Sequence, residues 1–88
     1  MTHAVSVLLD DGLLTLNRAV GVLRRRNVPV EGFALGPSGA AGVSRLTFST
    51  PIDAAAVDRV AQQFKKITGV REVLVTRADA ETAKEEEP

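Results

Sequence analysis

The sequence contains no cysteine, and this absence excludes a disulfide framework, a thiolate nucleophile and a thiolate metal site. A chain without cysteine suits a reducing compartment, so we expect a cytoplasmic protein. The single histidine is His3, which we expect to be a surface residue without a role. A chain with neither a second histidine nor a cysteine has no nucleophile–base pair and no recognisable cluster of metal ligands. We therefore expect no catalytic residue, no metal and no cofactor in this chain.

Aromatic residues and long apolar segments are also scarce. Aromatic residues make up 3% of the chain, with no Trp and no Tyr, whereas proteins that bind single-stranded nucleic acid stack the bases on aromatic side chains. No apolar run approaches the roughly 20 residues that span a bilayer. The first segment, MTHAVSVLLDDG, lacks the basic and apolar regions of a secretory signal. We expect neither a nucleic acid nor a membrane as a partner.

Charge divides the chain into two parts. The 88 residues are enough for one small domain, which is often only marginally stable alone. Residues 1–77 contain ten Lys and Arg and six Asp and Glu, while residues 78–88 contain one Lys and five acidic residues. We expect a folded domain over residues 1–77 and a disordered acidic tail over residues 78–88. The tail either keeps the protein soluble or lies on a basic surface of the domain or of a partner.

Hydrophobic periodicity predicts a strand and then a helix in the first third of the chain. Residues 4–9 alternate between two faces, as a strand does, and residues 13–26 repeat apolar side chains at helical spacing. Asp11 is placed to cap the start of this helix. The apolar stripe that we expect to face the core comprises Leu13, Leu16, Val20 and Leu23.

The next segments predict a hairpin. Pro29 cannot continue the helix, so residues 29–36 are expected to form a second strand. Its alternation is interrupted at Gly32, which indicates a bulge. The glycine-rich residues 36–42 then form a connection to a third strand over residues 43–49, with Leu46 and Phe48 on its inner face.

A second helix and a fourth strand complete the chain. Thr50 is expected to cap the helix, Pro51 suits its first position, and Asp53 can complete a capping box. The apolar stripe of this helix comprises Val57, Val60, Phe64 and Ile67. Gly69 is expected to end the helix in a left-handed conformation, and residues 70–76 form the last strand.

The element order β-α-β-β-α-β predicts an α+β fold, the ferredoxin-like sandwich, in which two helices cover one face of a four-stranded antiparallel sheet. The first and third strands are central, and the second and fourth form the edges. The second strand carries few charges along its unpaired edge, so we expect a homodimer through this sheet edge. The uncovered face of the sheet is expected to carry a mixed set of side chains, namely Ser6, Leu8, Arg45, Thr47, Glu72 and Leu74.

Three features are candidates for chemistry. Asp10 and Asp11 are adjacent carboxylates, which we interpret as one helix cap and one solvated group; the alternative is an acid–base pair. The glycine-rich residues 36–42 join two strands, so they lack the helix N-terminus that a phosphate loop uses. The arginines of the segment 24–26 either complement the helix dipole or contact a partner.

The segments VSVLLDDGLLTLNRAVGVLRRRNVPVEGFALGP, GVSRLTF and QQFKKITGVREV resemble the ACT domain of the small, regulatory subunit of acetolactate synthase (acetohydroxyacid synthase). The resemblance covers residues 4–77. The combination of an Arg-Arg pair, a Glu, a Gly-Pro pair and a Ser-Arg pair in register is fairly specific. The matching residues are Ser6, Val7, Leu8, Leu16, Arg18, Gly21, Arg25, Arg26, Glu31, Gly36, Pro37, Ser44 and Arg45.

The resemblance implies a function in branched-chain amino acid biosynthesis. In this family the ACT domain binds a branched-chain amino acid, usually valine, across a dimer interface. The subunit activates a large catalytic subunit, to which thiamine diphosphate, Mg and FAD would belong. The family's effector site combines the turn after the first strand of one chain with the start of the second strand of another. The corresponding positions here are Asp10, Asp11, Gly12, Leu13, Leu14, Pro29 and Val30.

Several of these positions depart from the family pattern. Asp11 replaces an asparagine and would repel the carboxylate of an amino acid. The pair Leu13-Leu14 replaces Pro-Gly, so Leu14 would fill the room that the glycine leaves. Pro29 replaces an asparagine and has neither a backbone N–H nor an amide. We therefore expect a plugged, degenerate effector site, and the chain looks most like the short, single-domain, valine-insensitive small subunits.

The leading hypothesis is a non-catalytic subunit that dimerises and activates the large subunit. We expect its contacts with that partner among Arg18, Arg24, Arg25, Arg26 and Arg45. The alternative is a free-standing ACT domain that senses an amino acid or another small molecule. An RNA-binding domain of the same topology is disfavoured, because it stacks bases on aromatic residues of its central strands, and Phe48 is expected to face the core.

Overall fold

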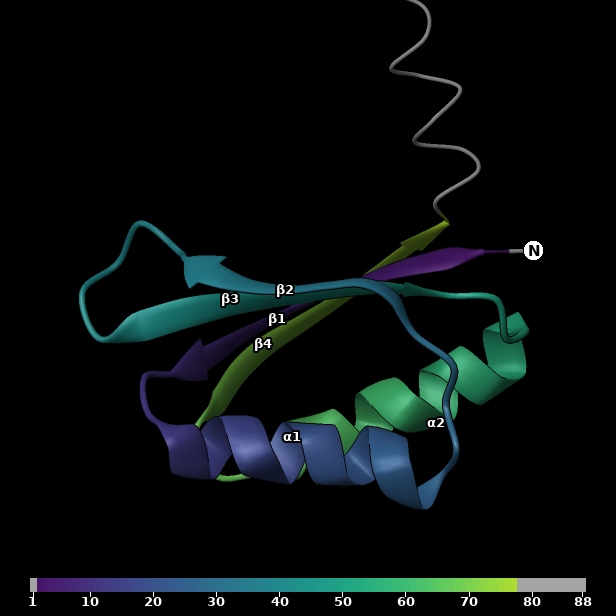
Figure 1. Ribbon diagram of the computed structural model, residues 1–88, viewed down its shortest axis with the longest axis horizontal. Coiled ribbons are helices and arrows are strands. Elements are labelled where there is room, and N and C mark those ends of the chain that lie inside the picture. The colour runs from purple at the N-terminus through teal and green to yellow at the C-terminus, as the bar shows by residue number, and fades with distance from the viewer. Residues whose placement is uncertain (1, 78–88) are drawn as a thin grey trace, which may run out of the picture.

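The computed structural model describes residues 2–77, so the tail expected over residues 78–88 lies outside the described part. The helices and strands follow the predicted order, with ends that differ by a few residues. They are β1 (His3–Asp10), α1 (Leu13–Arg25), β2 (Glu31–Pro37), β3 (Val43–Thr50), α2 (Ala54–Lys65) and β4 (Val70–Arg77). The four strands form one layer and the two helices form a second layer against one of its faces (Figure 1).

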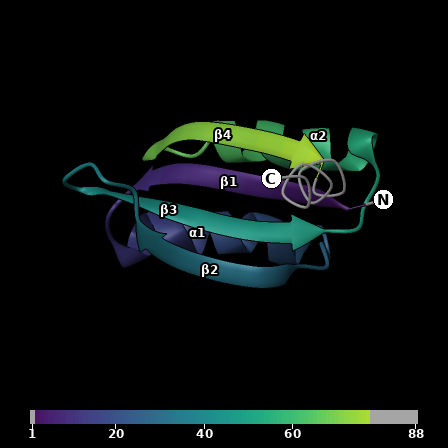
Figure 2. The same cartoon turned by 90° about the horizontal axis from the view of Figure 1, so that it is seen from above.

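The sheet has the order β2-β3-β1-β4, and every neighbouring pair is antiparallel (Figure 2). β1 and β3 are therefore central and β2 and β4 form the edges, as predicted. The pairing of β2 with β3 is interrupted between Glu31 and Ala34, where Gly32 has a φ of +63°. This irregularity confirms the bulge, and the whole arrangement confirms the ferredoxin-like sandwich.

The core lies between the sheet and the helices. Alternate residues of β1 and β3 face inward, as the period of two requires. From α2, Phe64 is fully buried and meets Phe48 edge to face, with ring centroids 6.2 Å apart. The buried apolar residues are Val5, Val7, Leu9, Ala19, Val22, Leu23, Leu46, Phe48, Val57, Val60, Ala61 and Phe64.

The inward face of α1 differs from the predicted stripe. The helix buries Thr15, Ala19, Val22 and Leu23, whereas Leu13 is 81% exposed. Within the predicted stripe, Leu23 is buried and Leu16 packs partly against the core, so the prediction fails mainly at Leu13.

The predicted helix caps are also partly wrong. Gly12, rather than Asp11, is the N-cap of α1, and no side chain caps this end. Asp53 caps α2 by accepting from the backbone N–H of Ala56 at 2.8 Å. Thr50 is the last residue of β3 and does not cap α2, because the chain needs three more residues to turn from the sheet to the helix. Pro51 lies in this connection and precedes the helix.

The histidine is not the surface residue that we expected. His3 is 4% exposed, because it is the first inward-facing residue of β1. Its Nδ1 lies 3.0 Å from the carbonyl oxygen of Ile52, in the connection to α2. The hydrogen bond satisfies one ring nitrogen and joins the start of β1 to the start of the second helix.

Candidate functional site

The turn between β1 and α1 is held by the ends of two other connections. The backbone N–H of Asp10 donates to the carbonyl of Gly69 at 2.7 Å, just before β4. The backbone N–H of Asp11 donates to the carbonyl of Gly42 at 3.0 Å, just before β3. The turn that carries the predicted effector residues is thus fixed from both sides by backbone hydrogen bonds.

Side chains from the same two strands hold the carboxylates of this turn. The Nε of Arg71 donates to the carboxylate of Asp10 at 2.6 Å, and the hydroxyl of Ser44 donates to the carboxylate of Asp11. Neither carboxylate caps α1, so the interpretation of a helix cap is wrong, whereas both acidic side chains remain open to solvent as well as bound to a side-chain donor. Ser44 is one of the residues that match the family pattern, although its bond to Asp11 was not predicted. Nothing in the sequence indicated that Arg71 would pair with Asp10.

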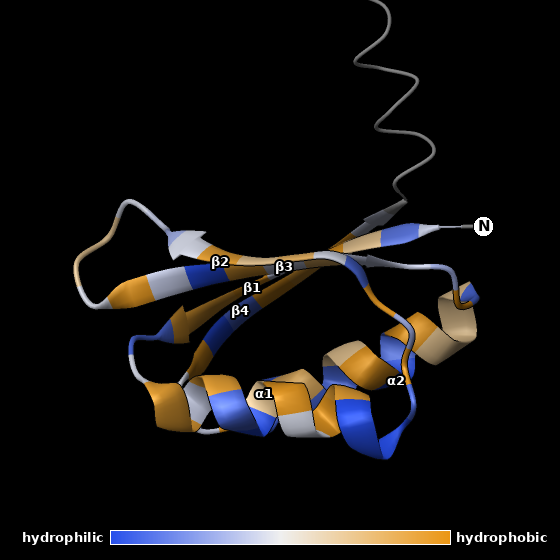
Figure 3. Cartoon of the chain, in the orientation of Figure 1, coloured by the Kyte–Doolittle hydropathy of each residue, from blue (hydrophilic) through white to orange (hydrophobic). Residues whose placement is uncertain are grey.

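The two leucines after this turn project away from the domain. Gly12 has a φ of +126°, and the chain then enters α1 with Leu13 and Leu14, which are 81% and 62% exposed. Their apolar character is visible at the first turn of α1 (Figure 3). Within one chain, these side chains contribute an exposed apolar knob, which we call the leucine knob.

The second part of the predicted effector site lies at the other end of α1. Pro29 and Val30 are exposed and directly precede β2. An α-helix rises about 1.5 Å per residue, so the 13 residues of α1 separate the two parts of the site by about 20 Å. The residues Asp10–Leu14 and Pro29–Val30 can therefore approach each other only between two chains.

An apolar groove occupies the side of α1 next to β2, and we call it the α1–β2 groove. Its volume is about 570 Å³. Phe33 forms part of its wall and stacks on Phe48 of the core, with ring centroids 6.3 Å apart. The groove is lined by Val20, Leu23, Arg24, Asn27, Val28, Val30 and Phe33. The sequence did not reveal this groove, because its walls come from segments that only the fold brings together.

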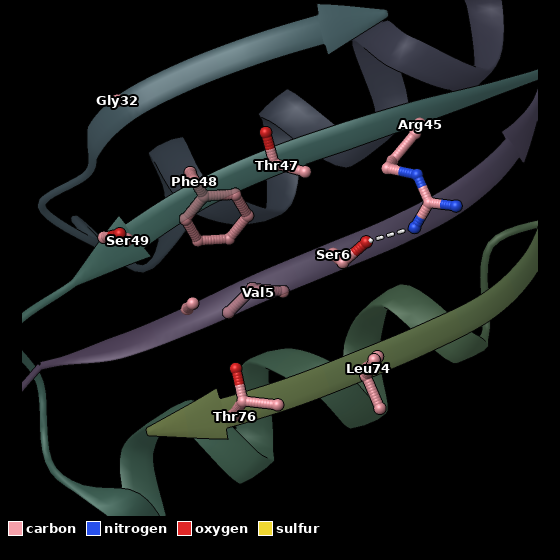
Figure 4. Close-up of a pocket in the computed structure, with 10 residues that line it drawn as sticks. Val5, Ser6, Gly32, Arg45, Thr47, Phe48, Ser49, Leu74 and Thr76 are labelled. Carbon is pink, nitrogen blue, oxygen red and sulfur yellow. Dashed lines mark hydrogen bonds between the residues drawn. The ribbon is translucent and has the colours of Figure 1, made fainter. Parts of the chain in front are cut away.

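The predicted arginine contacts lie on two different faces. Arg18, Arg24, Arg25 and Arg26 are exposed on α1 or directly after it, on the helical layer. Arg45 lies on the opposite face of the sheet, where it donates to the hydroxyl of Ser6 at 3.1 Å (Figure 4). The five arginines do not form one patch, so a single flat partner surface cannot contact all of them.

The face of the sheet without helices carries the mixed side chains that we predicted. The register places Ser6 of β1 between Thr47 of β3 and Leu74 of β4. A shallow hollow of about 370 Å³ lies over these residues and beside Arg45 (Figure 4). This face combines small polar side chains with the exposed Leu74.

The described residues offer little for metal chemistry or membrane insertion. Between residues 2 and 77, no group of three or more His, Asp or Glu side chains is placed to hold a metal ion. Neither of the two described helices has the length and apolar character required to cross a bilayer.

Comparison with known proteins relates the chain to one group of subunits. The small subunit 1 of acetolactate synthase from Nicotiana plumbaginifolia is 32% identical over 72 residues, which are 82% of this chain and 16% of that protein. The small subunit from Mycobacterium leprae is 29% identical over 84 residues, or 96% of this chain and 50% of that protein. No family model matches the chain.

Solved structures agree with these relatives. The acetolactate synthase small subunit from Thermotoga maritima superposes with a TM-score of 0.78 at 23% identity, over 85% of this chain and 47% of that chain. The ACT domain of GTP pyrophosphokinase from Chlorobium tepidum superposes with a TM-score of 0.66 at 14% identity, over 85% of this chain and 96% of that chain. The chain has the fold of an ACT domain and is related in sequence to acetolactate synthase small subunits.

The chain spans half or less of the length of these two curated relatives. The sequence relatives confirm the resemblance to acetolactate synthase small subunits, and the solved structures confirm the fold. The roles of the individual turn, groove and arginine residues stay predictions.

Proposed function

We propose that this ACT domain acts as a regulatory, non-catalytic small subunit of acetolactate synthase, which dimerises and raises the activity of a thiamine-diphosphate-dependent large subunit. The observation that carries the proposal is the similarity to small subunits over nearly all of the described chain, from two independent relatives. The chemistry, and with it thiamine diphosphate, Mg and FAD, would belong to the large subunit. A cytoplasmic location stays a prediction from the cysteine-free composition.

Activation requires contacts that differ between two states of the large subunit, because a ligand or subunit shifts an equilibrium only through its differential affinity. The end of α1 offers the densest positive charge for such contacts, with Arg24, Arg25 and Arg26 adjacent in sequence and all exposed. Arg45 would have to contact a different part of the partner, since it lies on the other face of the sheet.

The effector site is proposed to be degenerate. Asp11 replaces the family's asparagine in this turn, and its negative charge would repel the carboxylate of an amino acid. Leu14 replaces a glycine at the start of α1, and Pro29 offers no N–H at the other part of the site. We propose that branched-chain amino acids do not regulate this subunit.

The test is to co-express the chain with an acetolactate synthase large subunit, purify the complex and measure turnover. We expect co-purification and a rise in turnover. The double substitution R25A/R26A should reduce the activation, whereas Arg59→Ala, an exposed arginine of α2, serves as the control. Absence of both co-purification and activation with the wild-type chain would refute the proposed function.

Thermal-shift or calorimetric titration with valine, leucine and isoleucine tests the effector site. A ligand at a hundredfold excess over its dissociation constant stabilises a protein by about 2.7 kcal/mol. We expect no shift with any of the three amino acids. A clear shift would contradict the degenerate site and would favour the alternative, a free-standing sensor domain.

A further inference from the structure

We propose that the leucine knob of one protomer, Leu13 and Leu14, inserts into the α1–β2 groove of a second copy and there takes the place of a small-molecule effector. This inference deepens the proposed function, on which its regulatory meaning rests. Such an insertion would let the dimer form without a ligand, because the leucines of one protomer would fill the α1–β2 groove of the other.

The exposure of the knob is the first observation. Leu13 and Leu14 are 81% and 62% exposed, although leucine side chains gain free energy from burial. Other large exposed apolar residues lie on the same side of the domain, in or beside the strand β2. They are Val30, Phe33 and Leu35. Such a concentration on one side of a small domain indicates an interaction surface.

The position of the groove is the second observation. The knob lies at the N-terminal end of α1, whereas the groove lies beside the C-terminal half of α1 and the start of β2. A knob cannot reach the groove of its own chain, because α1 is rigid and about 20 Å long. In a two-fold dimer with antiparallel α1 helices, each knob would meet the partner's groove, so both contacts form at once.

Charge selects a second copy as the occupant. Each knob lies two residues after Asp11, whose carboxylate has only the neutral Ser44 as a side-chain donor among the described residues. Each groove carries Arg24 on its rim, and within residues 2–77 this arginine forms no ion pair. Antiparallel pairing of the two helices would bring the acidic start of each helix beside the basic end of the other, where the two macrodipoles also attract. The surface is therefore complementary to itself in both charge and apolar character.

The edge of β2 is continuous with this surface. β2 pairs only with β3, so its outer backbone groups are free within the described chain. A two-fold axis beside β2 would place both the helices and the strand edges of the two protomers next to each other. The contact through the sheet edge that the sequence predicts and the insertion of the leucine knob are thus compatible within one dimer.

Analytical ultracentrifugation of the full chain over a range of concentrations tests the inference. The double substitution L13S/L14S should raise the dissociation constant of the dimer by about a hundredfold or more, since four leucine side chains per dimer lose their burial. Leu74→Ser is the matched control, because Leu74 is 53% exposed on the other face of the sheet. It should leave the dissociation constant unchanged.

A mixing experiment separates insertion in trans from a folding defect. Val30→Asp places a carboxylate in the groove and leaves the knob intact, while L13S/L14S leaves the groove intact. Each variant alone should dimerise weakly, whereas their mixture should form heterodimers at least about tenfold more tightly than either alone, because one of the two contacts is restored. A mixture no tighter than the separate variants would overturn the inference.

The same samples distinguish the inference from the proposed function. A wild-type chain that activates the large subunit, together with an L13S/L14S dimer as tight as the wild type, would refute the leucine insertion and leave the proposed function standing. A loosened L13S/L14S dimer, together with no effect of the wild-type chain on the large subunit, would support the insertion and refute the proposed function.

Discussion

The close approach of Gly69 to α1 gives the sharpest stability prediction for this domain. Gly69 has a φ of +102°, and its carbonyl accepts the hydrogen bond from Asp10 that fixes the turn before α1. A Cβ at this position would lie 2.7 Å from Oγ1 and 3.1 Å from Cγ2 of Thr15. Thr15 is itself buried against the sheet and cannot move aside easily. A substitution of Gly69 therefore meets two separate costs.

The magnitude follows from these two costs. A non-glycine residue with a positive φ costs about 1–2 kcal/mol, and forcing extra atoms into a packed site costs about 1–3 kcal/mol. Gly69→Ala should therefore reduce the free energy of unfolding by about 2–5 kcal/mol. A domain of this size is stable by about 5–15 kcal/mol, so the loss is a large fraction of the total. The melting temperature should fall by about 10 °C or more.

Urea unfolding followed by far-ultraviolet circular dichroism is the appropriate assay, because the chain has no Trp or Tyr for fluorescence. Gly39→Ala is the matched control, since Gly39 has a φ of +94° and a Cβ at this position would meet no heavy atom within 4 Å. It should lose only the backbone part, about 1–2 kcal/mol. The double variant with Thr15→Ala should recover the steric part. Equal losses for Gly69→Ala and Gly39→Ala, with no rescue by Thr15→Ala, would refute the steric argument.

Two further predictions concern the connection between β3 and α2. Thr50 is fully buried and its hydroxyl has no partner among the described residues, so Thr50→Val should raise the free energy of unfolding by about 1 kcal/mol in the same urea assay; a loss of stability would contradict the unsatisfied hydroxyl. Asp53→Ala removes the N-cap of α2 and should cost about 1 kcal/mol, whereas Asp58→Ala, an exposed acidic residue within the helix, should change stability by less than about half of that.

The candidate site shows where sequence-based reasoning stops. The residues of the turn, Asp10–Leu14, were identified from their resemblance to a family, and their positions after a strand and at a helix start were correct. The partners of the two carboxylates were not predictable, because Ser44 and Arg71 are distant in sequence and meet the turn only through the order of the strands. The α1–β2 groove was missed for the same reason.

The stripe of α1 shows a different limit. Periodicity finds the most apolar side of a helix, and the pattern Leu13, Leu16, Val20, Leu23 was read as the side facing the core. The structure buries Leu23 of this stripe together with Thr15, Ala19 and Val22, and it leaves Leu13 exposed at the start of the helix. Exposed leucines at the start of a helix indicate a surface that contacts another molecule. Periodicity alone cannot distinguish such a contact surface from the side that faces the core.

The sequence by itself determined the order of the helices and strands, the central and edge strands, the bulge at Gly32 and the relationship to acetolactate synthase small subunits. These follow from local periodicity, turn residues and short motifs, all of which act over a few neighbouring residues. Only the tertiary structure decided that His3 is buried, that Leu13 and Leu14 are exposed, and that Ser44 and Arg71 hold the carboxylates of the turn. Those properties depend on how segments distant in sequence pack against one another. The packing energy is a sum over many such contacts, and these cannot be inferred from neighbouring residues in the sequence.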